Sequence, residues 1–397
     1  MKPNALEEIF SRALAGLDPA VRVHDALRSP PVSDRVRVVA IGKAAPAMVL
    51  GAMKRWGSAI EHVLVVAPDG AKRVRGAETI IAAHPLPDLR SVRAAERCIA
   101  LVSAPSSSSI LVLALLSGGA SSLVCAPIAN VTLARKRAVA SAMLRSGASV
   151  QEINVVRKHL SRIKGGGLVR AAAKRSVLTL VVSDVIGGRA SDVGSGPTVS
   201  DDSSVADARR LLRRYAPRFA DVPLGSTLAR AAHVRARIIV RPEELAHLVA
   251  TGLSSSGVAA RVLPPAADDV HVLAASYVAL ARRLGRKSAV VRVAEPALVV
   301  PARAGQGGRS THLAALVARD LPPDVLLFAA ATDGVDGGSG TAGAIVDGRF
   351  ATRVARARID DALSRFDTGL LHHRFGSART EGTTGHNLAD LHVLLRR

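Results

Sequence analysis

The chain has 397 residues, 48% of them hydrophobic and only 2% aromatic, and a formal net charge of +22. This length predicts two domains with aliphatic cores. The arginines are spread along the whole chain and few aromatic rings are available for base stacking, so no specific nucleic-acid partner is expected, whereas anionic substrates would be attracted. No apolar run reaches the ~18 residues of a membrane span, there is no signal-peptide pattern, and Cys98 and Cys125 lack metal or redox spacing, so we expect a cytoplasmic protein.

The first hundred residues alternate helices and strands. Lys43 lies at a strand-to-helix junction, where its ammonium group can reach a phosphate. A solvated lysine is the other interpretation. The expected elements are a helix over 4–28, a strand at Val36–Ala40, a helix over Ala44–Trp56, strands at Val63–Ala67 and Thr79–Ala83, and a helix over Ser91–Val102.

The most informative stretch is Ser109–Pro127, SILVLALLSGGASSLVCAP. Ile110–Leu116 is an uncharged apolar run typical of a strand buried on both faces. In the turn that follows, glycines let an anion approach the backbone and serines can cap a helix. This order favours a phosphate or carboxylate site, although a tight turn that binds nothing is the alternative. The turn residues are Ser117, Gly118, Gly119, Ala120, Ser121 and Ser122.

Two further polar segments follow, separated by expected elements. In Ile153–Arg170, cations recur at helical spacing beside a glycine triplet, and they either clamp phosphates or form a solvated face. The strand Ser176–Val182 is followed by Asp184 and a glycine-rich loop. Ligands of open α/β sheets lie at such strand ends, so Asp184 either binds Mg²⁺ or accepts a hydroxyl proton, unless it only caps a helix. Helices are expected over Thr132–Ser146 and Val205–Tyr215.

The pattern loosens after Pro217 and a new alternation begins at Arg237, which divides the chain into domains 1–232 and 233–397. Arg309 lies in a second glycine-rich turn, Ala304–Ser310, at the N-terminal end of the helix that follows. A cation there is misplaced unless an anion joins it. The expected elements are helices over Pro242–Ser255, Asp269–Leu284 and Thr311–Arg319, strands at Ala259–Leu263 and Asp324–Ala331, and a hairpin of Ser288–Val293 with Ala297–Val300.

Two more loops carry candidate ligands. Asp333 and Asp336 stand three residues apart in a glycine-rich loop, which suits a divalent cation. The GxGxxG match at Gly338–Gly343 is not a dinucleotide fingerprint, because it does not directly follow the strand. GTTGHN at Gly382–Asn387 is a third turn of the kind that binds phosphate.

Six blocks in one order resemble the type II glycerate kinases, which carry a C-terminal MOFRL domain and include proteins called hydroxypyruvate reductases of tartrate utilisation. The resemblance implies an α/β fold with two domains: a larger Rossmann-like N-terminal α/β/α domain and a smaller C-terminal α/β MOFRL-type domain with a mixed sheet. It also implies ATP-dependent phosphorylation of D-glycerate to 2-phosphoglycerate, with Mg²⁺, in a cleft between the domains. The blocks are IGKAA, LLSGGASSL, INVVRKHLSRIKGG, SDVIG…GSGPTVSD, TDGVDG…AGAIVDG and GTTGHNLADL.

The resemblance implies specific roles for these residues. Lys43 and Arg309 are the expected catalytic cations, Asp184 the expected base or metal ligand, and Asp333 and Asp336 rival metal ligands. The expected partners are ATP and D-glycerate or a similar hydroxy acid, without a membrane and with a homodimer left open. The expected substrate- or phosphate-binding residues are Ser117, Gly118, Gly119, Ser121, Ser122, Asn154, Arg157, Lys158, Lys164, Gly196, Thr198, Thr384 and Asn387.

The chain departs from the family pattern at several positions. Ser310 and His312 replace an amide and a carboxylate in the family's GGRN-x-E motif. Losing acidic side chains weakens metal binding, which keeps open a weakened kinase relative that binds an anionic metabolite. An NAD-dependent hydroxypyruvate reductase is the other alternative, although no credible GxGxxG lies in a βαβ unit. Further departures lie at Gly188, Arg189, Ala294 and Ala389, and in the turn Glu381–Asn387.

Overall fold

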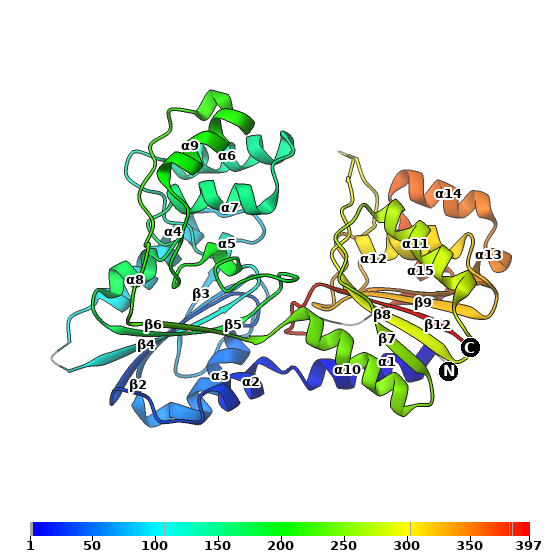
Figure 1. Ribbon diagram of the computed structural model, residues 1–397, viewed down its shortest axis with the longest axis horizontal. Coiled ribbons are helices and arrows are strands. Elements are labelled where there is room, and N and C mark those ends of the chain that lie inside the picture. Colours follow the sequence, from blue (N-terminus) through cyan, green and yellow to red (C-terminus); the bar gives the residue numbers. More distant parts are fainter. Residues whose placement is uncertain (1–2, 107, 302, 381, 383) are drawn as a thin grey trace. The chain divides into compact units, whose positions relative to one another are not determined.

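The computed structural model describes residues 3–106, 108–301, 303–380, 382 and 384–397. Contacts divide the chain into two units (Figure 1). The N-terminal unit is Pro19–Val240, and the C-terminal unit combines Met1–Asp18 with Arg241–Arg397. The two-domain α/β prediction is confirmed. The observed division differs from 1–232 and 233–397, because the strand at Val234–Val240 pairs within the N-terminal unit and the first helix packs in the C-terminal unit.

The N-terminal unit is built on a six-stranded, entirely parallel sheet in the order β3-β2-β1-β4-β5-β6. Helices cover the sheet, and this strand order is that of the Rossmann fold. Strand β4 is buried at every residue, as its uncharged sequence predicts. The strands are β1 Arg35–Ile41, β2 Ile60–Pro68, β3 Glu78–Ala82, β4 Ile110–Ser117, β5 Ser176–Val182 and β6 Val234–Val240.

The helices of this unit depart from prediction at two places. The helix expected over 4–28 is split, because Pro19 begins a new helix and cannot donate a backbone hydrogen bond to continue the first. The helix expected after the SGGASS turn is a single turn, because the chain is extended again from Val124. The helices are α2 Pro19–Ala26, α3 Ala45–Trp56, α4 Leu89–Ser103, α5 Ala120–Leu123, α6 Leu133–Arg145, α7 Val150–His159, α8 Gly167–Ala172 and α9 Val205–Tyr215.

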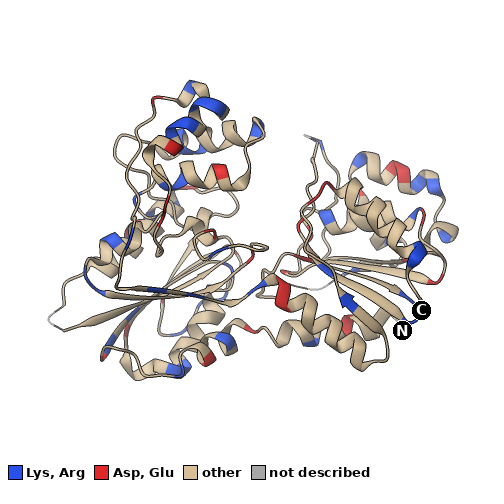
Figure 2. Ribbon diagram, viewed as in Figure 1, with Lys and Arg blue, Asp and Glu red and all other residues tan. Residues whose placement is uncertain are grey.

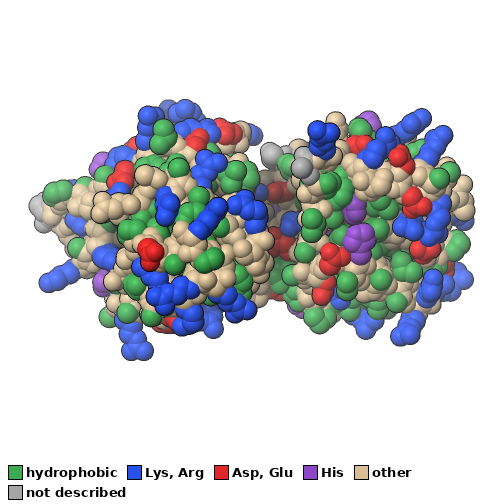
Figure 3. Space-filling model, turned by 90° about the horizontal axis from the view of Figure 1, so that it is seen from above, with side chains coloured by type: hydrophobic (Ala, Val, Ile, Leu, Met, Phe, Trp, Pro, Cys, Tyr) green, Lys and Arg blue, Asp and Glu red, His purple; other side chains and the backbone are tan. Residues whose placement is uncertain are grey.

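Helices α6, α7 and α9 pack on one another around a small core of their own, which includes Met143, Ile153 and Leu212. In Figure 1 this helical group stands above the sheet. Figure 2 shows Lys and Arg residues along it. On the face seen in Figure 3, basic side chains are scattered over both units and not gathered into one stripe.

The C-terminal unit has a mixed sheet in the order β11-β10-β9-β12-β8-β7, as predicted for this domain. Sequence patterning missed its central strand, β12, which is antiparallel to both β8 and β9. The hairpin expected around Pro296 is wrong, because β7 and β12 already occupy both edges of β8 and Ala297 forms only an isolated bridge with Asp269. The strands are β7 Ala259–Val262, β8 Ser288–Ala294, β9 Val325–Ala331, β10 Gly343–Asp347, β11 Ala378–Arg379 and β12 Asp390–Arg396.

Helices cover both faces of the mixed sheet (Figure 1). Phe10 of the first helix is buried, with its ring centroid 5.2 Å from that of Phe328 on β9 and its face against the Arg379 guanidinium. Of the described helices, none is both long and apolar enough to span a membrane. The helices are α1 Pro3–Ala15, α10 Pro242–Ser255, α11 Val270–Arg283, α12 Arg309–Ala318, α13 Phe350–Arg353, α14 Arg356–Arg365 and α15 Thr368–Arg374.

Candidate active site

The strand order of the N-terminal unit reverses between β1 and β4. Strands β2 and β3 extend the sheet from β1 in one direction, and β5 and β6 extend it from β4 in the other. Helices that follow adjacent strands on opposite sides of such a point leave a crevice at the carboxyl ends of the two strands, where open α/β sheets bind ligands. The turn after β1 carries Lys43, and the turn after β4 is SGGASS.

Backbone contacts lock these two turns together. The Lys43 N–H donates to the Gly118 carbonyl at 2.9 Å, and the Ala44 N–H donates to the Ser117 hydroxyl at 3.0 Å. Gly42 has φ +134°, and a Cβ there would lie 2.1 Å from the Ser117 Oγ. Ser117 and Gly118, both predicted as substrate contacts, therefore hold the lysine turn in place.

Gly119 lies where the SGGASS turn approaches His84 and Lys43. It has φ +84°, and a Cβ built on it would lie 3.1 Å from the His84 ring and 3.5 Å from the Lys43 Cγ. The Ser122 hydroxyl donates to the Gly119 carbonyl at 3.0 Å. The structure thus brings the predicted residues Lys43, Gly119 and Ser122 together, and it adds His84, which sequence analysis did not select.

A cavity of about 420 Å³ opens beside this turn. Its walls come from the His84–Pro87 loop, from the turn, and from helices α6 and α7. Among the described residues that line it there are four cations and no Asp or Glu. The lining includes Gly119, Ser121, Ser122, Cys125, Lys136, Arg137, Arg157 and Lys164.

Three of these cations are withdrawn from water to different degrees. The Lys164 amine is buried and donates to the Ser121 carbonyl at 2.8 Å, to the Ser121 hydroxyl at 3.0 Å and to the Gly194 carbonyl at 3.2 Å. Lys136 donates to the Leu160 carbonyl at 3.1 Å, and burial lowers its pKa to about 8. Burial also lowers the pKa of Lys164 well below its usual range and lowers that of Arg157.

Other predicted binding residues serve the framework of this turn. Lys158 forms a buried ion pair with Asp201 at 2.7 Å. The Asn154 amide oxygen accepts from the Ser195 hydroxyl at 3.1 Å, which lies 3.3 Å from the Ser121 hydroxyl. Gly196, with φ +61°, accepts from the Gly166 N–H at 2.8 Å, and Thr198 is fully buried.

Asp184 follows β5, the strand next to β4, and is half-buried. Its position at the carboxyl end of the sheet is the one that sequence analysis anticipated. Gly188 and Arg189, two of the departures from the family pattern, lie in the loop after Asp184. Gly188 is buried, and Arg189 is exposed and donates its backbone N–H to the Asp192 carboxylate at 2.8 Å.

In the C-terminal unit, Arg309 opens α12 and is held by carboxylates. Its guanidinium lies 3.2 Å from the Glu295 carboxylate and 3.3 Å from that of Asp390. Burial raises the pKa of Asp390 to about 7, and the charge of Arg309 opposes this rise. The anion that a cation at a helix N-terminus requires is therefore supplied by the protein. Sequence analysis did not select either carboxylate, and Asp390 reaches Arg309 only because β12 pairs with β8 across a long stretch of chain.

The two predicted metal ligands of this unit are used locally. Both Asp336 oxygens accept backbone N–H groups at the start of α12, from Ser310 at 2.9 Å and Thr311 at 2.8 Å. Asp333 is half-buried and accepts the Val335 N–H at 3.0 Å. In the part of the chain that the structure describes, no three His, Cys, Asp or Glu side chains gather as a metal site.

The last predicted turn is described in part. The Thr384 hydroxyl donates to the Thr332 carbonyl at 2.5 Å, and Asn387 is half-buried. Glu381 and Thr383 lie outside the described residues. Ala389, one of the departures, has φ +62°.

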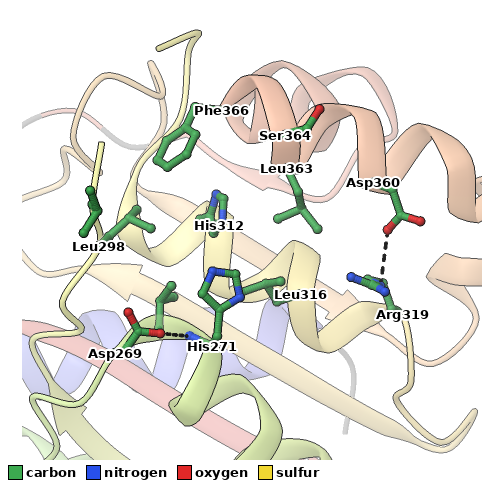
Figure 4. A pocket seen from close by; sticks show the side chains of 12 residues that line it. Asp269, His271, Leu298, His312, Leu316, Arg319, Asp360, Leu363, Ser364 and Phe366 are labelled. Carbon is green, nitrogen blue, oxygen red and sulfur yellow. Dashed lines mark hydrogen bonds and ion pairs between the residues drawn. The ribbon is translucent and has the colours of Figure 1, made fainter. Parts of the chain in front are cut away.

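The substituted positions near Arg309 are buried. Ser310 is fully buried, and His312 packs on Phe366 with ring centroids 4.8 Å apart. Burial lowers the pKa of His312 to about 4, so its imidazole is neutral at physiological pH. His312 also lines a second cavity, of about 690 Å³, where Figure 4 shows its ring beside His271. Ala294, the remaining departure, is a buried residue at the end of β8.

Comparisons with known proteins agree with this arrangement. A model described as a domain of unknown function, DUF4147, matches residues 5–223, and the MOFRL family model matches residues 288–390. A D-glycerate 2-kinase from Thermotoga maritima is 32% identical, with 97% of this chain and 96% of the relative covered. The chain belongs to the glycerate kinase family.

A solved structure and a further relative also cover nearly the whole chain. A crystal structure of a glycerate kinase from Thermotoga maritima superposes with a TM-score of 0.86 at 29% identity and covers 99% of both chains. A protein from Agrobacterium vitis is 34% identical over 98% of this chain and 93% of its own, and it bears a provisional name as a hydroxypyruvate reductase. The glycerate kinase assignment therefore extends over both units, and the chain is an enzyme of the kinase class.

Proposed function

We propose that this enzyme transfers the γ-phosphoryl group of ATP to D-glycerate and forms 2-phosphoglycerate. The observation that carries the proposal is the meeting of the Lys43 turn with the SGGASS turn where the strand order reverses, beside a cavity lined by cations. Relatives named as glycerate 2-kinases support the choice of substrate. Enzymes catalyse phosphoryl transfer mainly by positioning the reactants and stabilising charge, and these residues suit that task.

Each candidate residue then has a defined role. Lys43 contacts the transferred phosphoryl group, and Asp184 accepts the proton of the glycerate 2-hydroxyl as its oxygen bonds to the γ-phosphorus. The bond from that phosphorus to the bridging oxygen breaks, and ADP leaves. Arg309 stabilises charge on the same group, which places the reaction in a cleft between the units that closes on the substrates. A phosphate that binds Arg309 must compete with Glu295 and Asp390.

Magnesium fits this proposal only as a partner of ATP. No described cluster supplies three side-chain ligands, but Mg²⁺ commonly binds one or two carboxylates together with substrate phosphates. Asp184 or Asp333 would hold it, since both are half-buried, whereas Asp336 is committed to α12. When bound, the ion neutralises charge between the β- and γ-phosphates.

The test is ADP production from ATP, Mg²⁺ and D-glycerate. We expect turnover that requires glycerate and falls about 10²–10³-fold in Lys43→Ala, because one preorganised contact to the transition state is lost. Lys174→Ala, which removes an exposed lysine from the same unit, is the matched control and should retain full activity.

Two results would contradict the proposal. NADH oxidation by hydroxypyruvate in the same sample, without ADP production, would favour the reductase. Ligand-induced stabilisation without turnover would favour a relative that only binds an anionic metabolite.

We place the enzyme in the cytoplasm, where ATP is available. Light scattering on the same sample decides whether it is a homodimer.

A further inference from the structure

The cavity beside the SGGASS turn has an apolar rim. Leu86 in the loop after β3 is 62% exposed, Leu144 at the end of α6 is 65% exposed, and Val150 at the start of α7 is 62% exposed. These side chains come from three separate segments and line one cavity. Scattered exposed aliphatic residues are ordinary, but several around one opening mark a surface that contacts an apolar group.

The inner wall of the same cavity is cationic. Lys136 is buried, Arg157 is half-buried, and the Lys164 amine holds the turn behind them. Arg157 makes no hydrogen bond or ion pair with the residues that the structure describes, and the described lining contains no carboxylate. Buried like charges without a counter-charge are unfavourable, so this wall is suited to a bound anion.

A ligand that satisfies both walls has an apolar end and a strongly anionic end. D-glycerate has three carbons that all carry oxygen, so it offers no apolar face to the rim. The volume of about 420 Å³ lies in the range of sites for much larger small molecules. A nucleoside di- or triphosphate has both ends, and its phosphates would also reach the backbone of the Gly119 turn.

We infer that this cavity is the nucleotide site of the enzyme. The base and ribose lie against Leu86, Leu144 and Val150, and the phosphate chain lies on Lys136, Arg157 and the SGGASS turn. This inference rests on the proposed function, because it assigns one of the two substrates to this cavity. It leaves D-glycerate to the far side of the turn, toward Lys43 and Asp184.

Calorimetric titration with ADP tests the assignment without turnover. We expect the double variant Leu144→Asn/Val150→Asn to weaken ADP binding about tenfold, because two apolar contacts to the base are lost. Its affinity for inorganic pyrophosphate should stay unchanged. Arg157→Gln should weaken both ligands. Leu50→Asn is the matched control, since Leu50 is 54% exposed on α3 and does not line the cavity.

Kinetics separate this inference from the proposed function. In the active enzyme, the double variant should raise KM for ATP and leave KM for D-glycerate unchanged. Variant-sensitive ADP binding without glycerate phosphorylation would reject the proposed reaction and keep the nucleotide site. The inference is overturned if the wild-type protein binds no ADP at millimolar concentration, if the double variant binds ADP normally, or if the variant changes KM for D-glycerate instead. Because both substituted side chains are largely exposed, a melting curve should show that the variant folds.

Discussion

Lys136 lies among groups that all affect its charge. It faces Arg157, Lys164 and Cys125 across the cavity wall, and its one described hydrogen bond goes to a carbonyl. Burial lowers its pKa from the ordinary 10.5 to about 8. The free protein therefore gains stability from this group as pH rises from about 8 toward 10.5, because only the unfolded chain remains protonated there.

Anion binding should have the opposite pH dependence. A phosphate favours charged Lys136, so ADP affinity should fall roughly five- to tenfold between pH 7 and pH 9 as the lysine loses its proton. Calorimetry at the two pH values measures the change. Lys136→Gln should bind more weakly at pH 7 and lose most of this dependence. Equal affinities of the wild-type protein at both pH values would show that Lys136 is not in contact with the phosphates.

For single residues, the sequence shows which chemical groups are present but not which partners they contact in the fold. Arg309 at the start of a helix does need an anion, and Glu295 and Asp390 supply it within the fold. Asp336 is a carboxylate in a glycine-rich loop, which is typical of a metal ligand. In the fold, both of its oxygens cap the start of α12. Spacing along a chain does not show which donors a carboxylate will meet, so these roles depended on the tertiary structure.

Among the elements, the junction of β1 with β4 leaves no room for a side chain at Gly42. Gly42→Ala would bring a Cβ to 2.1 Å from the Ser117 hydroxyl and 2.6 Å from its carbonyl oxygen, with φ in a region that alanine rarely adopts. We expect a loss of roughly 2–4 kcal/mol in the free energy of unfolding, together with loss of activity. Urea denaturation measures it. Gly57→Ala is the control, since nothing lies within 4 Å and φ is −46°; a comparable loss in both variants would contradict this account.

Element types were predicted well wherever the local pattern decides them. Strand β5 and helices α9 and α10 begin and end where the sequence places them. Strand β12 was missed and the hairpin after β8 was wrong for one reason. Both depend on which strand pairs with β8. The strand that does so lies about a hundred residues further along the chain, and such a pairing leaves no local signal in the sequence.

For the whole molecule, the first helix ties the beginning of the chain to the C-terminal unit. Phe10→Ala removes a fully buried ring from Phe328 and Arg379, and we expect it to cost about 3–5 kcal/mol. Hydrogen exchange should locate the loss in β9 and β12, with little change in β1 and β4. Uniform loss of protection in both sheets would contradict the division into units.

The arrangement of domains was only partly predictable. The composition shift near residue 233 indicated a second domain, and the change of unit lies a few residues later, between Val240 and Arg241. The apolar face of the first helix shows that the helix is packed on something, but not which sheet it covers. Only the packing of α1 against α10 and β9 decides this.

This arrangement has a consequence during translation. The ribosome makes α1 before the parallel sheet, whereas Phe328 and the strands of the mixed sheet are made long afterward. At about 5–20 residues per second, this delay lasts on the order of tens of seconds. The parallel sheet can assemble in that time. Leu6 and Phe10, which are buried in the finished protein, remain exposed on the nascent chain until the mixed sheet is made. The C-terminal unit therefore completes its core only by binding a segment that was synthesised before the whole N-terminal unit.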